Sequence, residues 1–334
     1  MLKLFFAPTL VSLVALGAVF VWGGVGALLL ATALAVLEIT LSFDNAVVNA
    51  KVLSEMSPVW QKRFLTWGIL LSVFGTRLVL PILIVSVVAF VSPVTITVLA
   101  LQDPEEYTRL LTAAEAAIKS FGGAFLLMVS LKYFFNVAKD VHWFAPLERH
   151  LVKWGRIEAV EIAFALLVLL VVSFFAHDPA ETVLRAGMIG IILFTVTEGV
   201  AHGLGVEAKG AVRTGTMLFV YLNLLDSAFS LDGVIGAFAL TTSLPIIVVG
   251  LGIGAYFVRA LTLHLVRAKT LEALRYLEHG AHWAIFGLAL AMFAGLIVKV
   301  PEVVIAIIGL GFIALAYISS RRALRVREIV DTLG

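Results

Sequence analysis

The sequence predicts an all-α membrane protein, a polytopic bundle of about ten helical spans arranged as an inverted repeat of two five-helix halves. Of its 334 residues, 61% are apolar and only 14% are charged, whereas soluble proteins carry about 25% charged residues. Apolar stretches near twenty residues, the length of a membrane-crossing helix, follow one another along the chain. The third observation is an acidic motif that occurs twice. Together these predict one transmembrane domain over residues 1–334 with no separate soluble domain.

Ten apolar segments are expected to form the spans. The first follows Lys3 and has small residues near Ala18, so a cleaved signal peptide is the alternative; the charge pattern below favours a retained helix. Repeat A is placed at about 4–176 and repeat B at about 185–319. The predicted spans cover residues 4–22, 25–50, 64–91, 116–137, 158–176, 185–204, 215–240, 244–266, 281–298 and 301–319.

Lysine and arginine are divided unevenly between the two ends of these spans. One side holds 17 of them and the other holds four, while three fall within spans. Because cytoplasmic loops of membrane proteins are enriched in basic residues, both termini are expected to be cytoplasmic, in a bacterial inner (plasma) membrane. A basic tail at 320–334 is expected to lie against the anionic inner leaflet. The segment 92–115, with several acids, is expected to be a solvated outer loop.

Composition also limits the chemistry. The net charge of +2 gives no indication of a nucleic-acid partner, and no nucleotide-binding G-x-x-x-x-G-K-[ST] motif is present. The chain has no cysteine, which excludes disulfides and thiolate metal sites. Any metal would meet oxygen and imidazole ligands, which favour cations such as Mg, Ca or Mn.

An acid–hydroxyl–acid motif occurs twice, 188 residues apart, as Glu38-x-x-x-Ser42-x-Asp44-Asn45 and as Asp226-x-x-x-Ser230-x-Asp232-Gly233. An aspartate at the centre of a membrane helix costs roughly 2.5–3.5 kcal/mol by insertion scales. Four such acids in two matching clusters therefore predict a positively charged guest. The simplest one is a divalent cation held between the two halves.

A second repeated pattern follows each motif. Gly68 and Arg77 lie nine residues apart in the third span, as do Gly250 and Arg259 in the eighth. Each arginine is expected to act as counter-ion to a motif acid; the alternative is that each extends to the membrane interface. With five spans per half, the two motif helices are expected to run antiparallel, around a site near the bilayer midplane.

Helical geometry constrains how the motif acids converge. Glu38 and Ser42 share a face, but Asp44 lies about 120° from Ser42, so the helix must bend or unwind near Ser42 for all three to face one site. The same expectation applies to Asp226, Ser230 and Asp232. Four acids around one ion leave excess negative charge, so one or two could carry a proton when the ion is absent, coupling cation movement to protons. The alternative is buried polar packing, with the acids paired to arginines.

Other polar residues in the spans are secondary candidates. Glu198 and His202 share a face of the sixth span and either extend the site or form a pair at the cytoplasmic end. Lys132 is either a buried partner for an acid or a lysine at the cytoplasmic interface. Asn223 precedes the second motif by three residues and is expected to face the same cavity. His279 and His282 have metal-ligand spacing, although interface histidines are commoner.

The two motif stretches, from Glu38 to Val47 and from Asp226 to Val234, resemble the two signature stretches of the TerC family of integral membrane proteins, as does Gly122-Gly123 running to Lys132-Tyr133. The resemblance covers roughly residues 25–300. That family belongs with the LysE-type transporters, is named for tellurium resistance, and has members implicated in manganese export. The resemblance implies a site at Glu38, Asp44, Asn45, Asp226, Ser230 and Asp232, with Ser42 as a supporting residue.

The predicted function is export of a divalent metal cation, manganese first and calcium as the alternative, carried as substrate with no tightly bound cofactor. The expected partners are this ion, the lipid bilayer and protons as counter-substrate; a homo-oligomer is left open. An enzyme is not expected, because an intramembrane aspartyl protease would carry a Gly-x-Gly-Asp motif that these stretches do not resemble. A membrane protein that supports metal or tellurite resistance without transport is the other alternative.

Overall fold

The computed structural model describes residues 2–203, 215–268 and 270–333, and within them the chain is helical with no β-strand. Among the described residues, six helices are long and apolar enough to cross a membrane. They cover Leu4–Leu41, Pro58–Ala89, Glu115–Phe134, Ala180–Gly199, Leu244–Arg267 and Val303–Arg325. Shorter apolar helices at Pro93–Gln102, Val160–Phe175 and Leu218–Ser230 lie between them in the chain.

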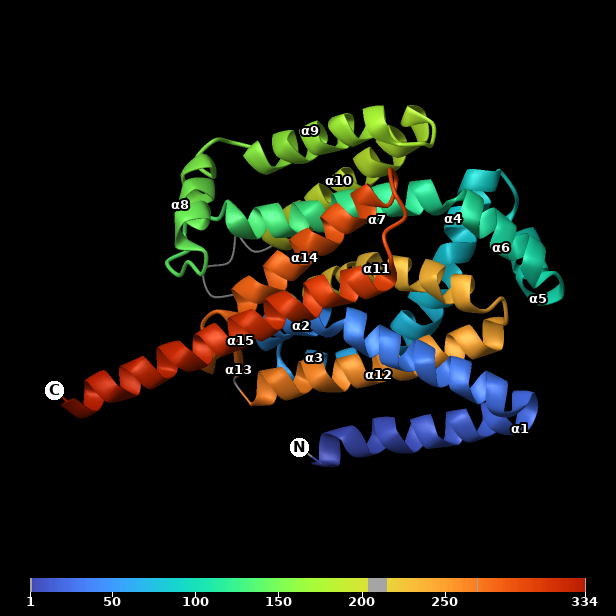
Figure 1. Ribbon diagram of the computed structural model, residues 1–334, viewed down its shortest axis with the longest axis horizontal. Helices are drawn as coiled ribbons and strands as arrows, with labels where there is room; N and C mark the ends of the chain where they lie inside the picture. The colour runs from blue at the N-terminus through green and yellow to red at the C-terminus, as the bar shows by residue number, and fades with distance from the viewer. Residues whose placement is uncertain (1, 204–214, 269, 334) are drawn as a thin grey trace.

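The first helix, α1 (Leu2–Leu41), is folded back on itself at Gly24, so that its two arms lie beside each other (Figure 1). Gly24 has φ 72° and ψ −165°, a backbone conformation that only glycine adopts without strain. The turn falls at the boundary predicted between the first two apolar segments, residues 4–22 and 25–50.

The second arm of α1 is followed by α2 (Phe43–Ser54) after a break at Ser42. Ser42 has φ −99° and ψ 14°, which lies outside the α-helical range. Backbone hydrogen bonds continue on both sides, from Ser42 N to Glu38 O and from Ala46 N to Ser42 O. The chain therefore bends here without a long unwound segment, as the first motif predicts.

The next rod joins three segments end to end: α3 (Pro58–Leu70), η1 (Leu71–Val79) and α4 (Leu80–Ala89). The central segment η1 is a π-helix, in which residues five apart are linked by hydrogen bonds, a widening often found at functional sites. Arg77 lies within it. No sequence pattern predicted this widening.

Residues 92–115 form two helices rather than the expected loop. Asp103 accepts a hydrogen bond from Glu106 N at 3.1 Å, and Ser92 accepts one from Thr95 N at 3.1 Å, so each residue caps a helix. Each cap is followed by proline at the first helical position, where its missing N–H costs nothing. The two helices are α5 (Pro93–Gln102) and α6 (Pro104–Ala113).

Most residues of α7 (Glu115–Phe134) are buried, and this helix packs against α9, α10, α11 and α14. Last in the chain, α15 (Glu302–Leu333) continues as helix into the predicted tail as far as Leu333. The others are α8 (Ala145–Trp154), α9 (Val160–Phe175), α10 (Ala180–Gly203), α11 (Gly215–Leu240), α12 (Leu244–Arg267), α13 (Thr270–Ala273) and α14 (Leu277–Ala294).

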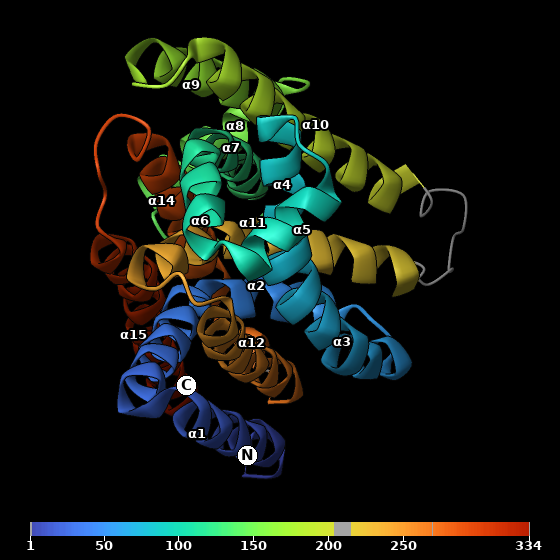
Figure 2. The same ribbon diagram turned by 90° about the vertical axis from the view of Figure 1, so that its right-hand side faces the viewer.

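The bundle has two distinct ends along its long axis. The start of α1 and the end of α15 lie toward the same end as α8 and α13, and α5 and α6 lie at the other (Figure 1). The view along the bundle places α11 and α2 in its interior, with α9 and α10 to one side and α1 to the other (Figure 2). Both acid motifs therefore lie in the interior of the bundle.

Candidate functional site

Two buried ion pairs form the centre of the site, one in each half of the chain. Arg77 on η1 donates to Glu38 on α1, and Arg259 on α12 donates through Nη2 to Asp226 Oδ2 on α11 at 2.8 Å. All four side chains are no more than 7% exposed. The predicted counter-ion role of both arginines is confirmed, and extension to the interface is wrong. Losing one partner would leave an uncompensated buried charge, so each pair depends on both members.

The widened turn of η1 places Arg77. Its Nη1 donates to the carbonyl oxygen of Ser72 at 2.8 Å and to Ser72 Oγ at 2.5 Å. Arg259 is held differently: its guanidinium lies 4.3 Å from the ring centre of Phe64, a cation–π contact. Gly68 lies beside it, because a Cβ there would come within 2.7 Å of Arg259 Nη1. A glycine of the first half therefore makes room for the arginine of the second.

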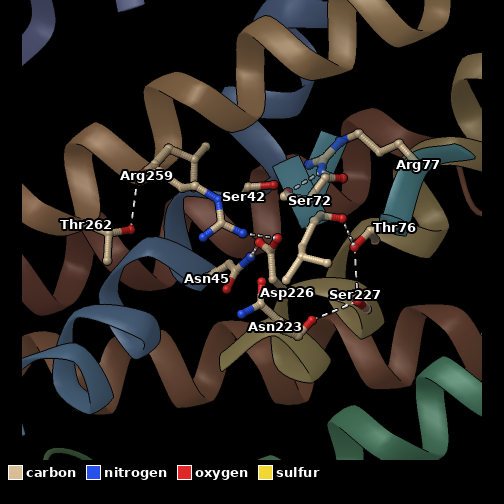
Figure 3. Close-up of polar contacts among 12 residues, drawn as sticks. Ser42, Asn45, Ser72, Thr76, Arg77, Asn223, Asp226, Ser227, Arg259 and Thr262 are labelled. Carbon is tan, nitrogen blue, oxygen red and sulfur yellow. Dashed lines mark hydrogen bonds and ion pairs between the residues drawn. The ribbon is translucent and has the colours of Figure 1, made fainter. Parts of the chain in front are cut away.

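Two hydrogen bonds bring the halves together at this centre (Figure 3). Asn45 of the first motif donates from Nδ2 to Asp226 Oδ1 of the second at 3.0 Å. The hydroxyls of Thr76 and Ser227 lie 3.0 Å apart, and Ser227 also donates to the carbonyl oxygen of Asn223 at 2.7 Å. The sequence did not single out Thr76 or Ser227, although each is next to a motif acid or its arginine.

A small, partly open cavity lies beside the Glu38–Arg77 pair, and the second motif contributes Phe229 and Gly233 to its lining. Its volume is about 20 Å³, enough for one water-sized guest, since that requires about 10–15 Å³. Its polar lining comes from Glu38, Thr40, Ser42 and Asp44, and a Cβ on Gly233 would lie 3.2 Å from Glu38 Oε2. Apolar side chains of α11, α14 and α15 close the rest: Phe229, Ala284, Leu288 and Ile305.

Asp44 is the motif acid in this cavity that has no cationic partner within the described part of the chain. It is 3% exposed, and Oδ1 accepts a hydrogen bond from the backbone N–H of Asn45 at 2.9 Å. Ser42 donates instead to Glu38 Oε1 at 3.0 Å. The bend at Ser42 thus turns Glu38, Ser42 and Asp44 toward one space, which confirms the prediction for the first motif.

The second motif behaves differently, and the expectation of a bend there is wrong. The helix α11 runs unbroken through it, so Asp226, Ser230 and Gly233 share one face by helical periodicity. Ser230 is 2% exposed, and its hydroxyl has no hydrogen-bond partner among the described residues. The side chain of Asp232 lies outside the described part of the structure.

The expected convergence of four carboxylates is not found among the described side chains, where no three acidic or histidine groups come together as a metal-ligand set. Glu38 and Asp226 are each paired to an arginine, which leaves Asp44 as the motif acid without a cationic partner among the described side chains. The cavity therefore offers one free carboxylate, one shared carboxylate and a hydroxyl. The alternative, in which the motif acids pair with arginines, is therefore found for Glu38 and Asp226.

The secondary candidates lie elsewhere. Glu198 and Lys132 line a separate cavity of about 220 Å³ among α7, α9 and α10. There Lys132 Nζ lies 3.8 Å from Glu161 Oε1 and 4.0 Å from Glu198 Oε1, with its side chain 47% exposed. Lys132 therefore lies near two carboxylates, at a position where its side chain is partly exposed. Glu198 does not line the Asp44 cavity. The side chain of His202 lies outside the described residues.

The two histidines with ligand-like spacing point to different partners. His279 Nδ1 lies 3.0 Å from Glu148 Oε2, and the ring of His282 stacks on Tyr133 with centres 3.7 Å apart. Glu148, on α8, is fully buried and also contacts Lys139 Nζ at 2.9 Å and Trp283 Nε1 at 3.1 Å. The sequence did not single out Glu148, since it sits in a short polar helix outside the apolar spans.

Comparison with known proteins gives one match. A family model described as "Protein of unknown function (DUF475)" matches residues 43–327, which include Asp44 and Asn45 of the first motif, the whole second motif and both arginines, but not Glu38 or Ser42. No curated protein and no solved structure matches the chain. Since the match covers most of its length, the chain belongs to the DUF475 family.

Proposed function

We propose that this protein is an integral membrane transporter that exports a divalent metal cation, most favourably manganese, through the Asp44 cavity. The observation that carries the proposal is a buried carboxylate that has no cationic partner among the described residues and faces a cavity lined by residues of both motif copies. A cation is the guest that would balance this charge in a low-dielectric interior. The resemblance of both motif stretches to the TerC family supports the same substrate class.

Charge balance sets what the site can hold. The Glu38–Arg77 and Asp226–Arg259 pairs are each neutral, so an ionised Asp44 would leave the described part of this network with one net negative charge. A divalent ion would find carboxylate oxygens of Asp44 and Glu38 and the hydroxyl of Ser42 around the cavity, all ligands that suit hard cations. Because the cavity holds about one water-sized guest, a bound ion would lose most of its hydration. These ligands suit several divalent cations; the resemblance to the TerC family is the reason that manganese is preferred, with calcium as the alternative.

Protons would serve as the counter-substrate. Moving a 2+ charge outward against an inside-negative potential of 100 mV costs about 4.6 kcal/mol. A proton carried by Asp44 on the return step would neutralise the buried carboxylate when the ion has left. Antiport of protons would thereby supply the energy for export.

The proposed architecture is ten crossings in two inverted halves, with both termini cytoplasmic in a bacterial inner membrane. The fold-back of α1 at Gly24 supports two crossings by that helix. The two acid–arginine pairs support the repeat, because each links a motif acid to an arginine on the rod that follows it in the chain. The placement of both chain ends at one end of the bundle supports an even number of crossings (Figure 1).

The test is manganese flux into proteoliposomes with an imposed pH gradient. Wild type should transport, and Asp44→Asn should abolish flux by removing the unbalanced charge. Asp232→Asn, measured in parallel, asks whether the second motif's last acid lies on the path. The control is Asp140→Asn, an exposed loop position, which should transport as wild type does.

Other results would point to the alternatives. No flux in wild type, with calcium and magnesium also tried, would favour a protein of metal or tellurite resistance that does not transport. Flux that survives Asp44→Asn would make this acid structural. Cleavage of labelled membrane-helix substrates, lost in Asp44→Asn, would indicate a protease; the pairing of Asp226 with Arg259 argues against a carboxylate dyad.

A further inference from the structure

Three buried amide oxygens on α2 and α11 have no hydrogen-bond partner within the described part of the chain: Oδ1 of Asn45, Asn49 and Asn223. Asn45 is fully buried and Asn49 is 2% exposed. A buried acceptor left without a donor costs about 1–3 kcal/mol, and native proteins contain few of them. The three oxygens are therefore free either to accept a hydrogen bond from water or to bind a cation.

The identity of two of these atoms as oxygen is fixed by their neighbours. Asn45 Nδ2 donates to the carboxylate of Asp226 at 3.0 Å, and Asn223 Nδ2 donates to the carbonyl oxygen of Phe219 at 2.7 Å. Both partners are acceptors only, so exchanging the amide nitrogen and oxygen would break each bond. The oxygens of Asn45 and Asn223 are therefore the free ends of their amides.

All three oxygens lie to one side of the Asp44 cavity. Asn49 follows Asn45 by one turn along α2, and Asn223 precedes Asp226 by about one turn along α11. Because α2 and α11 run in opposite directions (Figure 1), Asn49 and Asn223 both lie on the side nearer the chain termini. Figure 3 shows Asn45 and Asn223 next to Asp226.

Within the described part of the chain, no unpaired amide oxygen is found on the other side of the site. The 188-residue offset between the motifs relates Asn45 to Gly233, Asn49 to Ala237 and Asn223 to Ala35. Ala35 and Ala237 are buried, at 5% and 0% exposed, and neither has a polar side chain. Both motif copies thus contribute to the charged centre. Among the described residues, the unpaired amide oxygens lie toward the end of the bundle that holds the termini.

We propose that Asn45, Asn49 and Asn223 form a transit site for the exported divalent cation, between the Asp44 cavity and the end of the bundle that holds both termini. This inference rests on the proposed function. Amide oxygens can replace water around a hard cation without adding charge. Binding there would be weak, because Asp226, the carboxylate that Asn45 contacts, is already balanced by Arg259, and weak binding suits an ion in passage.

An apolar layer closes this route beyond Asn49. Leu53, one turn further along α2, packs with Leu218 and Leu222 of α11 and with Phe64 of α3. All four are at most 2% exposed. An apolar constriction of this kind blocks ions until it opens and hydrates. The transit site therefore lies behind a closed layer in this conformation.

The test replaces the oxygens by apolar groups of similar size, in Asn49→Leu and separately in Asn223→Leu. Manganese binding to the purified protein and manganese flux in proteoliposomes are both measured. Binding at the Asp44 cavity should stay within about threefold of wild type, while flux should fall about tenfold or more, as expected for one lost oxygen ligand worth about 1.4 kcal/mol. Val48→Leu, a buried neighbour on α2, is the control for packing and should leave both unchanged.

Each contrary outcome has its own meaning. Wild-type flux in both asparagine variants, with binding retained, would show that the oxygens hold only water and would overturn the transit site. Loss of binding together with flux, in protein that melts as wild type does, would make the asparagines part of the Asp44 site and would also overturn it. Wild type that neither binds nor transports would instead refute the proposed function. If Asn49→Leu does not fold, binding and flux measured in Asn223→Leu decide between these outcomes.

Discussion

Asn45 donates its side-chain N–H to Asp226 across 3.0 Å, and this bond joins the first copy of the acid motif to the second. Asp226 is held on its other oxygen by Arg259. The Asp44 cavity begins at the neighbouring residue of α2. One buried hydrogen-bonded network therefore joins residues of both motif copies. Substitutions at single positions in this network should affect stability and ion binding separately.

Gly233→Ala should weaken ion binding with little loss of stability. The added Cβ would lie 3.2 Å from Glu38 Oε2, which is close enough to press on a carboxylate lining a cavity of about 20 Å³. Manganese titration should show a higher dissociation constant. The matched control is Gly311→Ala on α15, where an added Cβ meets nothing within 4 Å. Equal affinity in the two variants would mean that the ion does not occupy this cavity.

Gly254→Ala should destabilise the fold. A Cβ there would meet Glu38 Cβ and Cγ at 2.5 Å and the carbonyl oxygen of Ala35 at 3.0 Å, so α12 could not approach α1 as it does. Overpacking of this kind costs about 1–3 kcal/mol, and the melting temperature in detergent should fall by several degrees. Gly26→Ala, where the space is open, should melt close to wild type. A wild-type melting temperature in Gly254→Ala would contradict the close packing of these helices.

Asp226 and Arg259 should show strong coupling in a double-mutant cycle. Arg259→Gln leaves a buried carboxylate unpaired and Asp226→Asn leaves a buried guanidinium unpaired, each of which costs about 3–5 kcal/mol. The double variant removes both charges and should lose less stability than the sum, with a coupling energy of about 0.5–3 kcal/mol. The exposed Glu181–Arg185 pair is the control and should show almost no coupling. Additive losses at Asp226 and Arg259 would exclude the buried pair.

Glu148 should stabilise the protein at neutral pH and lose that effect in acid. Burial opposes its ionisation, but hydrogen bonds from His279 and Lys139 and the charge of Lys139 hold the pKa of Glu148 well below its usual value of 4.5. Because the folded-state pKa is depressed, the stabilisation is present above about pH 4.5 and declines as the pH falls through the folded pKa.

The measurement is the melting temperature of wild type and Glu148→Gln from pH 7 downward. Glu148→Gln should melt lower at neutral pH, and the difference should narrow below about pH 4.5. Glu158→Gln, an exposed acid nearby in the chain, serves as the matched control. A difference between wild type and Glu148→Gln that is constant with pH would mean that packing, not charge, carries the contribution of Glu148.

The sequence alone indicated several features of the site through residue spacing. The offset of two between Ser42 and Asp44 required a bend, because a straight helix would have pointed Asp44 away, and α1 ends there. The nine-residue spacing of Gly68 and Arg77, repeated at Gly250 and Arg259, marked the two arginines that pair with motif acids. A charged side chain in an apolar helix has few alternatives to such pairing. Composition and spacing therefore indicated which arginines pair with the motif acids.

Only the tertiary structure decided how the two motifs differ. The second motif has the same spacing as the first, yet α11 stays straight through it, because tertiary packing overrides local pattern. The π-helical turn that places Arg77 on Ser72, and the contact of Asn45 with Asp226, depend on packing between segments far apart in the chain. The sequence thus determined which residues are costly to bury. The fold decided which of these residues neutralise one another. It also left Asp44 without a cationic partner among the described residues.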